Sequence, residues 1–396
     1  MRRGPVEKYL QGYAEPDVGE LPEDLGHWKH VVCIPACAEA GSLKHTLRTL
    51  SRVRDADKTL VVVVVNGRES AEASVQKSNE TTWAELHEDA QLNGTKVSFG
   101  CLYGMGLLAV DRWSKGRWLP EGQGVGLARK IAGDIALSLI FHGRVENPWI
   151  RMTDADVGVP IDFFAQLDGV PNDVSAVIAP FVHVPEGDDD QRAAMAAYDV
   201  YLQSYVDGLQ AAGSPYAFHT IGSLISVHAR AYAAVRGVPR REAGEDFYLL
   251  NKLAKVGTVL SLSGNPIEIR GRFSDRVPFG TGAALNEMCT EPSGSLKFQA
   301  YDPLVFEGLA TWLAALRVFV ERPVETELHD SIRCIAAPLG PALYDTLTAL
   351  GAFDAAVKAS TQVSGEQLHR RLMEWNDAFR TLKLIHGLRE RGVQGS

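Results

Sequence analysis

The sequence predicts an α/β fold, in which helices flank a mixed sheet with a parallel core, followed by a helical C-terminal region. Two apolar segments, residues 30–35 and 60–65, are separated by a helical pattern, and strand, helix and strand in this order form a βαβ unit. The second segment is apolar throughout, which is typical of parallel strands covered on both faces. Beyond about residue 290 the apolar spacing becomes helical.

The elements of the first half follow from local patterns. Residues 1–28 are rich in proline, glycine and acids, and we expect an N-terminal arm. Residues 40–50 are predicted as a helix, because their leucines recur at helical spacing. A second helix follows the glycine-rich residues 122–126. Residues 149–152 are a predicted strand that ends at Thr153-Asp154-Ala155-Asp156.

The remaining elements extend this pattern and set the expected domain limits. Further strands are predicted at residues 174–181 and 223–227, and helices at 192–209 and from Gly244 onward. We therefore expect an α/β domain over residues 29–285 and a helical region over 286–396. In that region, one helix face is predicted from the spacing of Leu368, Leu372, Trp375, Phe379 and Leu382. These C-terminal helices are expected to shape an acceptor site or a homodimer contact.

Composition excludes several classes of protein. The chain has 396 residues and a formal net charge of −9, so bulk nucleic-acid binding is not expected. No apolar run approaches the roughly 20 residues that span a bilayer, so no transmembrane segment is expected. The five cysteines are scattered, which indicates neither a zinc site nor a disulfide framework. A reducing, cytoplasmic location is the simplest expectation.

The segment containing Asp154 and Asp156 is the sharpest functional signal. Two carboxylates at the carboxyl edge of a sheet can bind a hard cation such as Mg²⁺ or Mn²⁺, and ligands favour that edge of open α/β sheets. Such an ion can neutralise a diphosphate. The alternative is a solvated turn whose acids cap a helix. His219 is a candidate additional metal ligand and is preferred to His183 and His228, although a structural role is the common one for a single histidine.

A second acidic segment, Gly244-Glu245-Asp246, opens a predicted helix. There a carboxylate can be a general base that removes a proton from a hydroxyl. The alternative is an ordinary helix cap.

Other residues are candidates for binding a nucleotide. Pro35, Ala36 and Glu39 form a strand end and turn that can hold a nucleoside, and Asn66 could face the base or simply form a turn. Basic residues could contact phosphates: Arg129, Lys130, Arg270, Arg272 and Arg276. For Lys130 the alternative is an ion pair with Asp134, four residues later on the same helix, and for the later arginines a solvated basic loop.

The order of these motifs resembles the family 2 glycosyltransferases, which have the GT-A fold, a Rossmann-like mixed sheet. The likeness spans residues 29–285, and the stretches 124–130, 243–248 and 274–282 resemble a soluble bacterial subgroup. The resemblance implies that Pro35, Ala36 and Glu39 hold the nucleoside. The chain departs from the family pattern at Ala38 and at Asn66, where an asparagine and an aspartate are usual.

The same resemblance implies the catalytic roles. Asp154 and Asp156 match the Asp-x-Asp motif, with Asp156 as the direct metal ligand, and Asp246 matches the base, supported by Glu245. The implied activity is that of a metal-dependent glycosyltransferase of the hexosyltransferase kind, which uses a nucleotide-sugar donor, UDP-linked by preference, and inverts the anomeric carbon. Two alternatives stay open: a retaining enzyme with a small anionic acceptor, and a nucleotide-sugar-binding protein without catalysis.

Overall fold

The structure is a computed structural model and describes residues 4–171, 173–271, 280–290 and 297–395. The chain divides into two compact units. The first comprises Met1–Met195 and Thr220–Pro292, and the second comprises Ala196–His219 and Ser293–Ser396. The residues expected to be a separate arm thus belong to the first unit. The second unit has two segments. The first begins within a long helix, α5 (Asp189–Ala211), and the second begins at Ser293, near the boundary expected at residue 286.

An eight-stranded mixed sheet forms the centre of the first unit, in the order β10-β7-β9-β5-β1-β2-β4-β3. Strands β5, β1, β2 and β4 run parallel to one another, whereas β3 and β9 are antiparallel to their neighbours. The strands are β1 (His30–Ala36), β2 (Thr59–Asn66), β3 (Val97–Leu102), β4 (Met105–Arg112), β5 (Trp149–Met152), β7 (Val174–Ile178), β9 (Ile225–His228) and β10 (Thr258–Ser261). The predicted α/β class with a mixed sheet is confirmed.

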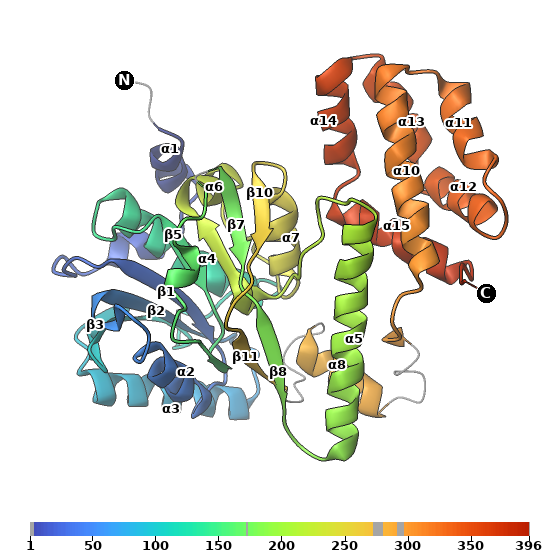
Figure 1. Cartoon of the computed structure of the whole chain (residues 1–396). Helices are drawn as coiled ribbons and strands as arrows, with labels where there is room; N and C mark the ends of the chain where they lie inside the picture. The colour runs from blue at the N-terminus through green and yellow to red at the C-terminus, as the bar shows by residue number, and fades with distance from the viewer. Residues whose placement is uncertain (1–3, 172, 272–279, 291–296, 396) are drawn as a thin grey trace. The chain divides into compact units, whose positions relative to one another are not determined.

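Helices cover both faces of this sheet. Every residue of β1 and β2 is buried, which explains why both segments are so apolar. Helix α3 packs on β2 and β3, and α4 packs on β1, β2 and β5; Figure 1 shows α3 and α4 on opposite sides of the strands. The helices of this unit are α1 (Pro5–Gly12), α2 (Ser42–Leu50), α3 (Ala73–Ala90), α4 (Gly124–Phe141), α6 (Ala229–Ala234), α7 (Glu245–Leu253) and α8 (Thr281–Thr290). A second, smaller sheet joins β6 (Val157–Gly158), β11 (Ile267–Gly271) and β8 (Phe181–Pro185).

The glycine-rich residues 122–126 form the turn before α4 and the first residues of this helix. Gly122 and Gly124 have positive φ angles of 74° and 26°. A Cβ on Gly126 would lie 2.5–2.6 Å from backbone atoms of Pro239 and Arg241, and its N–H donates to the Arg241 carbonyl at 3.0 Å. The glycines therefore let the segment before α7 approach the first turn of α4.

The N-terminal segment is fixed to α4 by buried polar contacts. Asp134 of α4 is fully buried and accepts hydrogen bonds from Tyr9 Oη at 2.6 Å, Tyr232 Oη at 2.9 Å and the Glu15 backbone N–H at 2.8 Å. Lys130 Nζ donates to the same carboxylate at 2.6 Å. A buried carboxylate with four donors is stable only while these donors stay in place, so this cluster holds the segment against the helix.

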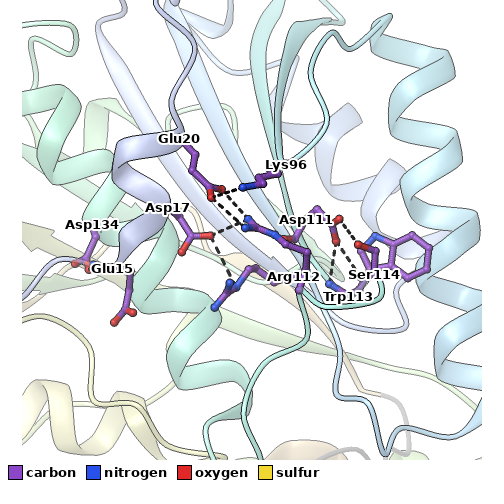
Figure 2. A network of polar contacts seen from close by, with 10 residues as sticks. Glu15, Asp17, Glu20, Lys96, Asp111, Arg112, Trp113, Ser114 and Asp134 are labelled. Carbon is purple, nitrogen blue, oxygen red and sulfur yellow. Dashed lines mark hydrogen bonds and ion pairs between the residues drawn. The ribbon is translucent and has the colours of Figure 1, made fainter.

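A short 3₁₀ helix, η1 (Pro16–Glu20), continues this attachment toward the end of β4 (Figure 2). Asp17, almost fully buried, lies 3.8 Å from Arg112 Nε, and Glu20 lies 3.2 Å from Lys96 Nζ. Arg117 Nη2 contacts Glu20 at 2.8 Å. The acids of the expected arm are therefore partners for basic residues of the α/β unit.

The second unit is helical, which confirms the predicted C-terminal region. Beyond the end of α5 it contains α10 (Pro303–Glu321), α11 (Glu325–Arg333), α12 (Leu339–Ala349), α13 (Ala352–Ser360), α14 (Gly365–Trp375) and α15 (Ala378–Glu390). Its core surrounds Trp312 of α10, with Leu309 and Ile385 also fully buried. Among the described residues, α10 alone is long and apolar enough to cross a membrane by length and composition, and half of its apolar window is buried. Core helices of globular units pass the same test.

The single helix face predicted over residues 368–382 is wrong, because two helices cover this stretch. Helix α14 ends at Trp375, and α15 begins at Ala378. Asp377 caps α15 by accepting from the Arg380 backbone N–H at 3.1 Å. Leu368 and Leu372 are buried, whereas Phe379 is 37% exposed. The apolar residues keep their helical spacing across the break between the two helices, and the break is marked by Asp377, which caps α15.

Replacing Asp134 by asparagine should lower the free energy of unfolding by about 3–5 kcal/mol, because Lys130 then stays buried without its nearest carboxylate. Urea unfolding followed by tyrosine and tryptophan fluorescence measures the change. The matched control is Glu88→Gln on exposed α3 surface, which removes one negative charge and should cost little. Equal stability of the two variants would show that the buried cluster does not hold the segment.

Candidate active site

The two segments predicted to bind the nucleoside and the metal lie at the ends of neighbouring parallel strands. From β1 the chain proceeds to β2 and β4 on one side, and then returns to β5 on the other side of β1. Cys33 of β1 pairs with Met152 of β5, and its carbonyl accepts from the Thr153 N–H at 3.0 Å. The carboxyl ends of β1 and β5 therefore meet where the strand order reverses, which is where ligands bind in open α/β sheets.

The buried guanidinium of Arg129 joins the Asp-x-Asp segment to the start of α7. Its Nε donates to Glu245 Oε1 at 2.8 Å, and its Nη2 donates to Asp154 Oδ1. Its Nη1 reaches the Gly222 carbonyl at 3.3 Å. Arg129 and Glu245 are each about 5% exposed, whereas the Asp154 side chain is 34% exposed. The two acidic segments thus converge on one cation, with Asp154 toward solvent.

This arrangement sets the charge of the cluster. Burial disfavours the charged guanidinium, but Asp154 and Glu245 outweigh that effect and raise the pKa of Arg129. Asp246, directly after Glu245, is half-buried. Burial first, and then repulsion by Glu245, raise the pKa of Asp246 to about 7, although the Phe247 N–H and Arg129 oppose the shift. A carboxylate with a pKa close to neutrality is well matched to proton transfer at physiological pH.

Asp246 contacts the first turn of α7 without being its N-cap residue. Helix α7 begins at Glu245, and its N-cap residue, Gly244, has a φ angle of 69° and no side chain to cap the helix. Asp246 Oδ1 accepts from the Phe247 N–H at 2.7 Å and so satisfies one amide of the first turn. Among the described residues, no donor contacts its Oδ2. One oxygen is therefore held by the helix, and the other is available to a ligand.

The loop that carries Asp154 and Asp156 could bind a cation together with the phosphates of a ligand. Asp156 is half-buried, and Asp154 is already contacted by Arg129 through one oxygen. Within the described part of the chain, no three His, Cys, Asp or Glu side chains gather as a ready-made metal site. Mg²⁺ is commonly bound through one or two carboxylates together with substrate phosphates. The donor set fits Mg²⁺ or Mn²⁺ bound jointly with a diphosphate.

The turn after β1 has a strained, externally supported backbone. Pro35 and Ala36 are buried in β1, and Glu39 is buried where its carbonyl begins α2. Between them, Ala38 has a positive φ of 56°, a conformation that costs energy for a residue other than glycine. The Ala38 N–H donates to Asn79 Oδ1 at 2.8 Å, which helps to hold this conformation. Strain maintained by a neighbouring helix is typical of binding turns.

Asn79 and Gly222 are site residues that sequence reasoning missed. Asn79 is fully buried in α3 and also donates to the Asn66 carbonyl at 2.9 Å, which links the turns after β1 and β2. The Asn66 side chain is itself buried, and its amide is placed to donate to the Ala36 and Val64 carbonyls at 3.2 Å. The buried residues of α3 are Asn79, Thr82, Leu86 and Ala90, so no apolar stripe in the sequence marks Asn79 as buried. Gly222 has no local signal either.

The other predicted binding residues have different surroundings. Lys130 faces Tyr9, the Tyr13 carbonyl and Asp134, so its alternative interpretation as an ion pair with Asp134 is correct. Arg129 is bonded to Glu245, Asp154 and the Gly222 carbonyl, and its contact with a phosphate stays a prediction. Arg270 pairs with Glu186 at 2.5 Å, and Arg272 and Arg276 lie outside the described residues. His219 belongs to the second unit, where its Nε2 lies 3.3 Å from Gln203, and its metal role stays a prediction.

No protein-family profile and no curated protein matches the chain. Among solved structures, S. aureus TarS in complex with UDP-GlcNAc aligns at 11% identity and a TM-score of 0.41, over 89% of this chain and 92% of that one. Mannosyltransferase PcManGT from Pyrobaculum calidifontis, in complex with GDP-Man and Mn²⁺, aligns at 17% identity and a TM-score of 0.37, over 96% and 94%. Glucosyl-3-phosphoglycerate synthase from Mycobacterium tuberculosis with UDP aligns at 12% and 0.35, over 75% and 86%. All three TM-scores lie below 0.5, so these alignments assign no activity to this chain.

Replacing Gly222 by alanine should disturb the Arg129 contacts. The new Cβ would lie 2.4 Å from Arg129 Nη2, and the guanidinium cannot withdraw without losing Asp154 or Glu245. We expect the free energy of unfolding to fall by about 1–3 kcal/mol. Thermal unfolding measures this, with Gly19→Ala as the control, since a Cβ there meets nothing within 4 Å. A Gly222→Ala protein as stable as the control would contradict the close approach.

Proposed function

We propose that this chain is a glycosyltransferase that moves a sugar from a nucleoside diphosphate sugar, UDP-linked by preference, to an acceptor hydroxyl with inversion at the anomeric carbon. The observation that carries the proposal is the convergence of Asp154 and Glu245 on the buried Arg129 guanidinium. Through this contact the loop of Asp154 and Asp156 lies near the half-buried Asp246 carboxyl, whose pKa is about 7. This combination, at the reversal of strand order, is what the resemblance to family 2 glycosyltransferases implies.

The proposed reaction uses three groups of the chain. Asp246 accepts the proton of the acceptor hydroxyl while that oxygen bonds to the anomeric carbon. The bond from the anomeric carbon to the diphosphate oxygen breaks, and its electron pair leaves with the nucleoside diphosphate. Asp156, assisted by Asp154, would hold Mg²⁺ or Mn²⁺, which supplies positive charge to the departing diphosphate. Glu245 acts as a positioning residue, because it fixes Arg129 and thereby Asp154.

The donor's nucleoside is proposed to lie against the turn at residues 36–39. This turn adjoins the acidic loop through the β1–β5 pairing, so one extended ligand can contact both. The strained Ala38 backbone, held by Asn79, gives the turn a fixed shape. Preorganisation of this kind lowers the entropy that is lost on binding.

Asp246→Asn should reduce transfer by about 10²–10⁴-fold and leave donor affinity unchanged, because the amide cannot accept the proton but keeps the shape of the carboxyl. A thermal-shift panel of nucleotide sugars, with and without Mn²⁺, first identifies the donor, since a specific ligand stabilises the folded state by mass action. Sugar transfer and donor hydrolysis are then measured, and calorimetry gives the donor affinity.

The matched control for this variant is the exposed Asp24→Asn, which should transfer like the wild type. Undiminished transfer by Asp246→Asn would remove Asp246 from the base role. Normal donor affinity with neither transfer nor hydrolysis in the wild type, over broad pools of acceptors, would favour a binding protein without catalysis instead.

The pH dependence of kcat/KM should report the Asp246 carboxyl. The reaction needs the deprotonated form, and a raised pKa keeps the proton bound to a higher pH. We therefore expect the rate to rise about tenfold per pH unit below pH 7 and to level off above it, since roughly a tenth of a group with this pKa is ionised at pH 6. Initial rates at saturating Mn²⁺ from pH 5 to 8.5 test this. A flat profile down to pH 5 would be inconsistent with Asp246 as the base.

A further inference from the structure

A cavity of ≈ 390 Å³ in the first unit is lined by four basic residues that the proposed reaction does not use. Its wall comprises the N-terminal segment at Tyr13, the middle of α4, the chain between α6 and α7, and α7 itself. A cavity of this size admits a small molecule. The basic residues are Lys130, Arg236, Arg240 and Lys252.

Carboxylates balance only part of this charge. Glu15 pairs with Arg240 at 2.7 Å, and Asp134 pairs with Lys130 at 2.6 Å. Within the described part of the chain, no carboxylate lies within ion-pair distance of Arg236 or Lys252. Four cations and two direct carboxylate partners leave an excess of two positive charges at one cavity.

The two unbalanced cations are held in place despite their repulsion. Lys252 is half-buried, and its Nζ donates to the Val235 carbonyl at 3.1 Å. Burial, followed by repulsion from Arg236 and Lys130, lowers the pKa of Lys252. Arg236 has a positive φ of 64°, and its guanidinium lies 4.7 Å from the centre of the Tyr13 ring. Arg236 is exposed, whereas the half-buried Lys252 has no carboxylate partner among the described residues. A partly buried cation of this kind costs stability, and a bound anion would relieve that cost.

The cavity is separate from the Arg129 site. Arg129 and Lys130 are consecutive on α4, and consecutive helical residues do not face the same direction. Arg129 points to Asp154 and Glu245, whereas Lys130 points to Tyr9, Tyr13 and Asp134. A ligand in the cavity would therefore not occupy the donor position.

We propose that this cavity binds a phosphomonoester group, with Arg236 and Lys252 as its principal ligands. A planar guanidinium and an ammonium supply several charge-assisted donors, which suits a doubly charged oxyanion. The remaining volume accommodates the organic part of a small phosphorylated molecule. The proposal does not depend on the glycosyltransferase reaction and can succeed or fail independently of it.

The test is calorimetric titration of the full chain with glycerol 3-phosphate at constant ionic strength set with chloride. We compare wild type, Arg236→Gln, Lys252→Gln and the exposed control Lys115→Gln. Wild type and control should bind saturably, and each cavity variant should bind at least roughly tenfold more weakly, because a hydrogen bond between charged groups is lost. The ligand-free cavity variants should melt close to the control. They lose mutual repulsion and no salt bridge, which offsets the loss of the Lys252 bond to the Val235 carbonyl or of the Arg236 contact with the Tyr13 ring.

A second arm distinguishes a soluble ligand from a lipid headgroup. Vesicles of phosphatidylcholine with phosphatidic acid present the same phosphomonoester on a membrane. If wild type binds these vesicles but not glycerol 3-phosphate, and both cavity variants lose vesicle binding, the ligand is a lipid headgroup. The cavity then still binds a phosphomonoester. The proposal is overturned if neither probe binds wild type, or if the cavity variants bind as tightly as Lys115→Gln.

Discussion

The candidate site depends on one buried cation, the guanidinium of Arg129, which Asp154 and Glu245 approach from segments far apart in the sequence. A guanidinium at this depth is tolerated only when it is paired, and removing one partner of such a group typically costs about 3–5 kcal/mol. The loop after β5 and the start of α7 therefore stay near each other, because the buried charge of Arg129 in α4 needs a carboxylate from each. Gly222 contributes by leaving room for the guanidinium. Burial first, and then repulsion by Glu245, raise the pKa of Asp246, while Arg129 opposes the shift.

Helix α4 links several features that look unrelated in the sequence. Its first turn lies against the segment before α7 because Gly126 has no side chain. Arg129 organises the candidate active site, and Lys130, one residue later, joins the N-terminal segment and contributes to the basic cavity. Nearly every residue of the helix is buried, which allows both polar networks to form away from bulk water. Buried networks of this kind are strong when complete and costly when broken.

The sequence predicts the fold well where burial dictates residue type. β1 and β2 are apolar because every residue is buried, and the acidic segments at Asp154 and Gly244 stand out because they follow or open regular elements. It could not give the partners of Arg129 and Lys130, since Glu245 and Tyr9 are more than 100 positions away. The break between α14 and α15 was obscured because the apolar spacing continues across Asp377. Long-range pairing and close glycine contacts have no local signature, so they require the three-dimensional structure.

The claim that Arg129, Asp154 and Asp246 form one electrostatic unit is tested most directly by titrating the Asp246 carboxyl. NMR of protein labelled with ¹³C-aspartate gives the titration curve, and Asp246→Asn assigns the signal. We expect a pKa of about 7 for this carboxyl in the wild type. We expect a lower pKa in Asp154→Asn, where one repelling charge is lost and Arg129 keeps its own. A pKa near 4 in both proteins, the ordinary value for a solvated aspartate, would show that Asp246 is not coupled to this cluster.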